Sequence, residues 1–180
     1  IADGAEIERL SNLPVRERIG RFKAVPYATY KAEAEKVTAE MTEQLDELVT
    51  ISIDATDFSY SNDCSNTGYE VDEQVTVRDL FYGTILPSGA DSAVSLATYV
   101  AGSQEAFVDM MNQKAAELGC KDTVFTNPHG LHDPNMYTTA RDICRLTDAA
   151  LENELFRTLF CAKTYEIPAT NKSEPRTITT

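Results

Sequence analysis

VTVRDLFYGTILPSGADSAVSLATYVAGS, residues 75–103, carries the clearest structural signals of the chain. Its first part has apolar residues at helical spacing, beginning at Val77. Thr76 is an N-cap residue, and Asp79 follows three positions later, as in a variant of the capping box. Pro87 lacks the N–H that a continuing helix needs. The pattern therefore predicts a helix over residues 76–86 that ends before Pro87.

A second apolar helix is predicted over residues 93–101, with Asp91 or Ser92 as its N-cap. Ser88 then lies on a tight turn between two buried helices. Such a turn can hold a catalytic or ligand-orienting hydroxyl in a fixed place. An isolated Ser-Gly pair is more often an ordinary turn, so the function of Ser88 depends on the motifs that accompany it.

Size and charge limit the classes of function. The chain has 180 residues, of which 42% are hydrophobic and 25% charged, as in one globular domain. Its net charge of −13 excludes nucleic acid as a partner and disfavours docking to an anionic membrane. No apolar run approaches the ~18 residues of a transmembrane helix.

The cysteines and histidines do not form a metal-binding pattern. The four cysteines include no CxxC pair, and we expect Cys120, Cys144 and Cys161 to be buried free thiols. His129 and His132 share a loop, but a zinc site needs a third ligand and defined geometry. We therefore predict no metal and no cofactor.

The coarse order of elements predicts an α+β domain. A short strand is expected over residues 49–52, an irregular loop over 54–70, and helices between 76 and 161. The segments 164–168 and 177–180 are strand-like. We expect an antiparallel sheet formed from both chain ends, with a helical lobe inserted between them.

Several stretches, taken together and in order, resemble the serine D-alanyl-D-alanine carboxypeptidases, which are low-molecular-weight penicillin-binding proteins of the peptidase S11 family. The stretches are LDELVTIS (45–52), VTVRDLFYGTILPSGAD (75–91), YVAGS (99–103), NPHGL (127–131), YTTARD (137–142) and IPATNK (167–172).

The resemblance implies a β-lactamase/transpeptidase-like (penicilloyl-serine-transferase) fold whose C-terminal strands are incomplete here. We interpret residues 1–180 as one partial domain, with a diverged part at 1–44, the helical lobe and its flanks at 45–163, and the first C-terminal strands at 164–180. The implied reaction removes the terminal D-alanine from peptidoglycan stem peptides through a serine acyl-enzyme, in which a neutral lysine acts as base.

The family motifs transfer unevenly to this sequence. By resemblance, Ser88 relays a proton near the leaving group, and Gly89 and Ala90 contact substrate, although Ala90 stands where an amide side chain is usual. Lys31 matches the motif lysine, which places Ala28 at the position of the nucleophilic serine. An alternative register uses Lys36 and puts Glu33 at that position. The Lys-Thr-Gly motif is absent from the 180 residues.

These departures leave three hypotheses for function. The first is an exported carboxypeptidase of the bacterial cell envelope, disabled or incomplete as written, with stem peptide and β-lactams as ligands and any anchor outside this sequence. The second is an inactive homologue that binds stem peptide or a partner protein. The third is a β-lactamase, for which no deacylating glutamate can be placed. A second chain that completes the sheet is a further expected partner.

Overall fold

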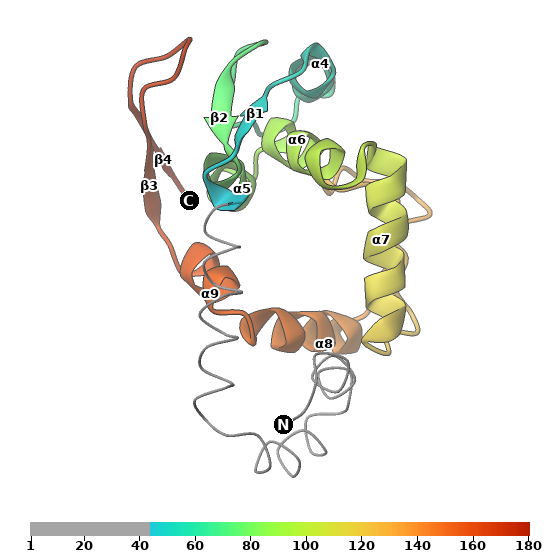
Figure 1. Cartoon of the computed structure of the whole chain (residues 1–180). Coiled ribbons are helices and arrows are strands. Elements are labelled where there is room, and N and C mark those ends of the chain that lie inside the picture. The colour runs from blue at the N-terminus through green and yellow to red at the C-terminus, as the bar shows by residue number, and fades with distance from the viewer. Residues whose placement is uncertain (1–43) are drawn as a thin grey trace, which may run out of the picture. The chain divides into compact units, whose positions relative to one another are not determined.

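The computed structural model describes residues 44–180, and Asp46–Thr180 form one compact unit. In chain order the elements are β1 (Leu48–Thr50), α4 (Ile53–Ser61), β2 (Gln74–Thr76), α5 (Val77–Ile85), α6 (Ala90–Ala101), α7 (Gln104–Glu117), α8 (Ala140–Leu151), α9 (Glu154–Phe160), β3 (Thr164–Ile167) and β4 (Arg176–Thr179). Both strand pairs lie on the same side of this unit, near α5, and the helices α7 and α8 lie away from them (Figure 1).

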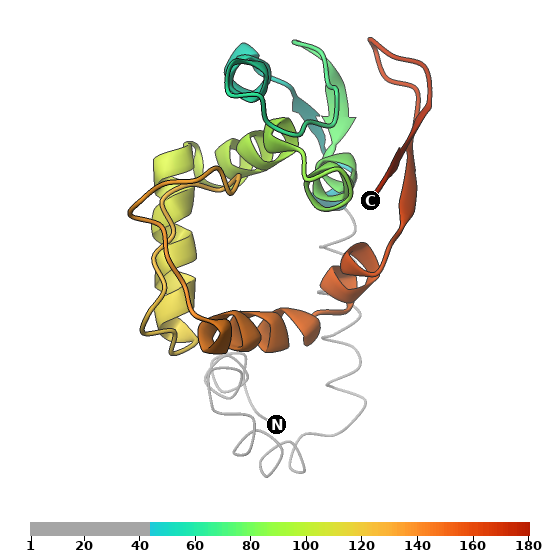
Figure 2. The same ribbon diagram turned by 180° about the vertical axis from the view of Figure 1, so that it is seen from behind.

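The strands within residues 44–180 form two separate antiparallel pairs. In the β1–β2 pair, Val49 lies opposite Val75. In the β3–β4 pair, Tyr165 lies opposite Ile178. The strand predicted at 49–52 and the two C-terminal strands are thus confirmed, with small shifts at their ends. Both views place the tip of the β3–β4 hairpin beside β2 (Figures 1 and 2).

The predicted capping box at the start of α5 is present in full. The Asp79 N–H donates to Thr76 Oγ1 at 3.1 Å, and the Thr76 N–H donates to Asp79 Oδ2 at 2.8 Å. Two N–H groups that the first turn leaves free are thereby satisfied. The helix ends at Ile85, two residues before Pro87, as the sequence predicted.

Helix α6 is the most deeply buried helix of the unit, since every residue from Ala90 to Ala97 is buried. It packs against α4, α5 and α7. The sequence placed its start at residue 93 with Asp91 or Ser92 as N-cap, and this was wrong. The helix begins at Ala90, Gly89 is the N-cap, and no side chain caps it. The Asp91 carboxylate binds a different segment of the chain, as described below.

Helices α7 and α8 each begin at a side-chain N-cap. Ser103 caps α7 by accepting from the Ala106 N–H at 3.1 Å, and Thr139 caps α8 by accepting from the Asp142 N–H at 3.2 Å. Gly119 follows α7 with φ +77°, a left-handed conformation that glycine adopts without strain. Met110 on α7 is 49% exposed.

Helix α4 corrects the loop predicted over residues 54–70. Serine and aspartate are abundant there, which is typical of loops, but in the structure they occupy positions that favour a helix start. The Ser52 hydroxyl accepts from the Ala55 N–H at 3.3 Å, and Asp54 lies in the first turn, where negative charge is favourable. The Ser59 hydroxyl is satisfied internally by donating to the Thr56 carbonyl.

The cysteine prediction was correct only for Cys120, which is buried. Cys144 and Cys161 are exposed, because α8 buries only Asp142 and Cys161 is the C-cap of α9. All four thiols are free.

Candidate functional site

Ser88 lies on the turn between α5 and α6, as the sequence predicted, and its backbone is strained. Its φ is +58°, in the left-handed region that residues with a side chain rarely adopt. Strain of this kind persists only where the surrounding structure enforces it, and it concentrates at functional sites. Ser88 is exposed, whereas Gly89 and Ala90 beside it are buried. Ser88 therefore reaches solvent from a turn whose next two residues are buried.

The carboxylate of Asp91 holds the segment opposite this turn. Asp91 is only 1% exposed. Its Oδ1 accepts from the Thr67 N–H at 2.9 Å and from the Ser92 N–H at 2.9 Å. Its Oδ2 accepts from the Gly68 N–H at 3.2 Å and the Tyr69 N–H at 3.4 Å. Hydrogen bonds to an ionised acceptor are roughly twice as strong as neutral ones, so these four donors account for a buried carboxylate.

The two segments approach so closely that only small residues fit between them. The hydroxyls of Thr67 and Ser92 are 2.6 Å apart. A Cβ on Gly89 would lie 2.2 Å from Thr67 Oγ1, and one on Gly83 would lie 2.3 Å from Ser92 Oγ. The Gly89 N–H donates to the Gly83 carbonyl at 2.9 Å. Gly89 has an ordinary negative φ, so the space alone requires glycine there.

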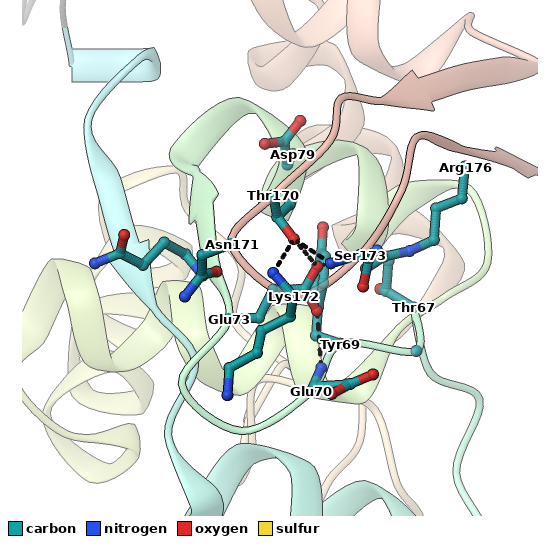
Figure 3. Close-up of polar contacts among 12 residues, drawn as sticks. Thr67, Tyr69, Glu70, Glu73, Asp79, Thr170, Asn171, Lys172, Ser173 and Arg176 are labelled. Carbon is teal, nitrogen blue, oxygen red and sulfur yellow. Dashed lines mark hydrogen bonds and ion pairs between the residues drawn. The ribbon is translucent and has the colours of Figure 1, made fainter.

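A second buried carboxylate, Glu73, ties the same segment to the β3–β4 hairpin (Figure 3). Glu73 is 0% exposed. Its Oε2 accepts from the Glu70 N–H at 2.8 Å, and its Oε1 accepts from Thr170 Oγ1 at 2.9 Å and Arg176 Nη1 at 3.0 Å. Burial alone would raise the pKa of Glu73, but these three donors outweigh it and lower the pKa below its usual value.

Asn171 and Tyr165 extend this connection to β2 and α5. Asn171 accepts from the Gln74 N–H at 2.7 Å and donates to the Asp72 carbonyl at 2.9 Å. The Tyr165 hydroxyl donates to Asp79 Oδ1 at 2.8 Å. The pKa of Tyr165 is raised, mainly by burial and secondly by this hydrogen bond to the carboxylate. The hairpin is thus attached through polar groups that lie about a hundred residues apart in sequence.

The structure brings together three of the five site residues predicted from the sequence. Ser88, Gly89 and Ala90 form one turn. Lys31 and Ala28 lie outside the described residues, as do the alternative positions Lys36 and Glu33. Sequence reasoning missed Thr67 and Glu73 and took Asp91 for a helix cap. No local pattern signalled the role of Asp91, because the backbone N–H groups that it binds lie 22 to 24 residues upstream.

The histidine loop is structural in the part of the chain that is described. Asn127 Oδ1 accepts from the Gly130 N–H at 2.7 Å, and Asn127 Nδ2 donates to the Leu131 carbonyl at 2.9 Å, which turns the chain. The ring of His129 packs on Phe58 with centroids 4.3 Å apart, and burial lowers its pKa. Within residues 44–180, no three His, Cys, Asp or Glu side chains are placed to hold a metal ion.

Known proteins share both the architecture and the sequence pattern of this chain. The unit has the penicillin-binding, β-lactamase-like α+β fold. It matches the crystal structure of a Streptomyces DD-transpeptidase with a TM-score of 0.70 and 32% identity, over 75% of this chain and 55% of that one. A D-alanyl-D-alanine carboxypeptidase from Mycobacterium tuberculosis matches with a TM-score of 0.66 and 30% identity, over 75% of this chain and 49% of that one.

The chain belongs to the D-alanyl-D-alanine carboxypeptidase family, peptidase S11, whose pattern it matches over residues 33–176. A D-alanyl-D-alanine carboxypeptidase from a Streptomyces species is 36% identical over 146 residues, which are 78% of this chain and 50% of the relative. The DacC carboxypeptidase of Escherichia coli is 46% identical over 81 residues, 45% of this chain and 20% of the relative. The chain thus covers half or less of these relatives.

The family and fold predictions are confirmed by these matches. Family members act on peptidoglycan outside the cytoplasm. Among the helices of residues 44–180, none is long and apolar enough to cross a membrane.

Gly89→Ala should destabilise the protein by about 3 kcal/mol, the upper end of the usual cost of overpacking, because the added methyl overlaps Thr67 Oγ1 in a packed interface. Gly102→Ala is the matched control. Gly102 has φ +80° and no atom within 4 Å of the position that a methyl group would take, so its cost is backbone strain of about 1–2 kcal/mol. Denaturant unfolding measures both, and equal losses would contradict the close approach at Gly89.

Glu73→Gln should lower the free energy of unfolding by about 3 kcal/mol, because it leaves the Arg176 guanidinium without its buried counter-charge. The exposed pair of Lys114 and Glu117 provides the control, since Glu117→Gln should leave the free energy of unfolding nearly unchanged.

The Glu73 contribution should also depend on pH. The pKa of Glu73 is lowered in the folded state, so its stabilisation is fully present above the unfolded pKa of about 4.3 and is lost as pH falls through the folded pKa. Chemical unfolding between about pH 3 and pH 6 should therefore show a shallower pH dependence for Glu73→Gln. An unchanged slope would refute this.

Proposed function

We propose that this chain binds the D-Ala-D-Ala terminus of peptidoglycan stem peptides at the Ser88 turn, as part of a D-alanyl-D-alanine carboxypeptidase that acts through a serine acyl-enzyme. The observation that carries the proposal is the position of Ser88. It is exposed and has a positive φ, and the buried residues Gly89 and Ala90 that follow it are held by hydrogen bonds. Membership of the S11 family supports the substrate class.

The proposed roles follow the chemistry of acyl transfer. A serine at position 28 would attack the carbonyl of the penultimate D-alanine while neutral Lys31 takes the serine proton. The C–N bond then breaks, and the leaving D-alanine amine receives a proton through Ser88. Water hydrolyses the resulting ester and regenerates the serine. Gly89 and Ala90 lie beside Ser88 and would contact the peptide backbone.

Ala28 gives weight to a second candidate, in which the chain binds stem peptide or a partner protein without turnover. Alanine has no nucleophilic atom, so no acyl-enzyme can form at that position in this sequence. Ala90 is weaker evidence for this second candidate, because it removes one side chain that could hydrogen-bond to the peptide and does not affect the nucleophile position.

The remaining proposals concern the setting of the protein. We propose a place in the bacterial cell envelope, with β-lactams as further ligands where a serine stands at position 28. We also propose that a second chain completes the sheet. We further propose that the sequence divides into a diverged part at 1–44, a helical lobe at 45–163 and strands at 164–180. Family membership supports the envelope and the peptide partner.

An acylated Lys-D-Ala-D-Ala peptide should shift the amide resonances of Ser88, Gly89 and Ala90 in NMR titrations, whereas the L-Ala-L-Ala isomer should leave them in place. Ser88→Ala should weaken binding roughly three- to tenfold, about one hydrogen bond. Ser61→Ala, an exposed serine on α4, is the control and should bind as the parent does. Absence of any shift would overturn the proposed binding function.

Ala28→Ser, in a chain extended past Thr180 to supply a Lys-Thr-Gly motif, should become covalently labelled by a fluorescent penicillin. Ala32→Ser, four positions further along the sequence, should remain unlabelled. Adding Lys31→Ala to Ala28→Ser should abolish labelling, because the base is removed. Gel fluorescence and intact mass measure the adduct. An unlabelled Ala28→Ser chain would show that the nucleophile was assigned to the wrong residue.

A further inference from the structure

The Ser88 hydroxyl is aimed by its backbone. Within residues 44–180, the structure gives Ser88 Oγ no hydrogen-bond partner, so no neighbouring side chain fixes it. Its direction follows from the left-handed φ of +58° and from whatever enforces that conformation. The next two residues are held by backbone contacts, since the Gly89 N–H donates to the Gly83 carbonyl and the Ala90 N–H donates to the Ser65 carbonyl, both at 2.9 Å.

The Ser65–Tyr69 segment is therefore the surface against which the turn is fixed, and Asp91 is what fixes that segment. Three consecutive N–H groups, those of Thr67, Gly68 and Tyr69, converge on one buried carboxylate, which also accepts from the Ser92 N–H. Asp91 lies three residues after Ser88, in the first turn of α6. Any movement of the segment must break these bonds or carry the turn with it.

We propose that Asp91 is a positioning residue, whose carboxylate enforces the left-handed conformation of Ser88 and so aims its hydroxyl at bound peptide. The statement about peptide rests on the proposed function, whereas the statement about Ser88 geometry does not. Asp91 touches neither substrate nor reacting atoms and acts through the Thr67–Tyr69 backbone.

Asp91→Asn tests the charge with almost no change in shape. An amide offers one acceptor oxygen and turns two N–H donors toward groups that are themselves donors. At least one of the four backbone N–H groups then loses its acceptor inside the protein, and the segment has to shift to reach another acceptor or water.

The chain offers a matched control in Asp142. It is also 1% exposed and accepts from a backbone N–H, that of Asp122, at 2.9 Å, and from Thr123 Oγ1 at 3.0 Å. It belongs to the start of α8, where it also pairs with Arg145 at 3.0 Å, and its hydrogen bonds go to residues of α8 and of the segment before it and not to those around Ser88. Asp142→Asn should therefore lower the melting temperature as Asp91→Asn does, but without an effect at Ser88.

The first readout is the free protein in NMR. Asp91→Asn should move the Cα and Cβ shifts and the amide coupling constant of Ser88 away from values of a positive φ, and should speed amide exchange at Thr67, Gly68 and Tyr69. Asp142→Asn should leave all of these unchanged. Ser88 resonances that keep their parent values in Asp91→Asn would overturn the proposal, whether or not the parent binds peptide.

The second readout is affinity for the acylated Lys-D-Ala-D-Ala peptide. Because Asp91 acts through the Ser88 hydroxyl, Asp91→Asn should weaken binding about three- to tenfold, as Ser88→Ala does, and Asp142→Asn should weaken it less than twofold. A parent protein that binds no peptide refutes the proposed function, and the NMR readout then decides the role of Asp91 alone.

Asp91→Glu covers the case in which Asp91→Asn does not fold. It keeps the charge but moves the oxygens by one methylene group, so the four N–H bonds form with poorer geometry. The Ser88 shifts should change in Asp91→Glu and stay constant in Asp142→Glu. Parent-like Ser88 shifts in Asp91→Glu would contradict enforcement by the carboxylate.

Discussion

The hydrogen bonds from three consecutive backbone N–H groups, at Thr67, Gly68 and Tyr69, to the buried Asp91 carboxylate are the constraint on which the candidate site depends. They join a segment without regular structure to the first turn of α6. The small residues Gly83 and Gly89 then allow this segment to approach the Ser88 turn at van der Waals distance. A strained residue can persist there because both sides of the turn are fixed.

The far end of the same segment is held by Glu73, which binds Thr170 and Arg176 of the C-terminal hairpin. Two buried carboxylates therefore connect the hairpin to the Ser88 turn through residues 65–73. An apolar residue could not replace either carboxylate without loss of stability. Each carboxylate accepts from backbone N–H groups that would otherwise be buried without a partner. In an acyl-transfer enzyme, whose groups must meet within a fraction of an ångström, such a connection favours a fixed geometry between two distant parts of the chain.

Local signals in the sequence were sufficient for much of this fold. The Thr76 capping box and the stop at Pro87 each depend on residues a few positions apart, and each was predicted. Asp91 was misjudged because its partners lie 22 to 24 residues upstream, beyond any periodic pattern. The family motif located Ser88, but only the structure revealed its positive φ and its bracing. Lys31 and Ala28 remain predictions, because they lie outside the described residues.

A crystal structure of this chain soaked with an acylated D-Ala-D-Ala peptide would show whether the Ser88 turn binds the peptide terminus. We expect the terminus within hydrogen-bond distance of Ser88 Oγ, with Ser88 still at positive φ and the Asp91 contacts to Thr67, Gly68 and Tyr69 intact. Peptide bound elsewhere, or bound at the turn with Ser88 relaxed to negative φ, would contradict this expectation.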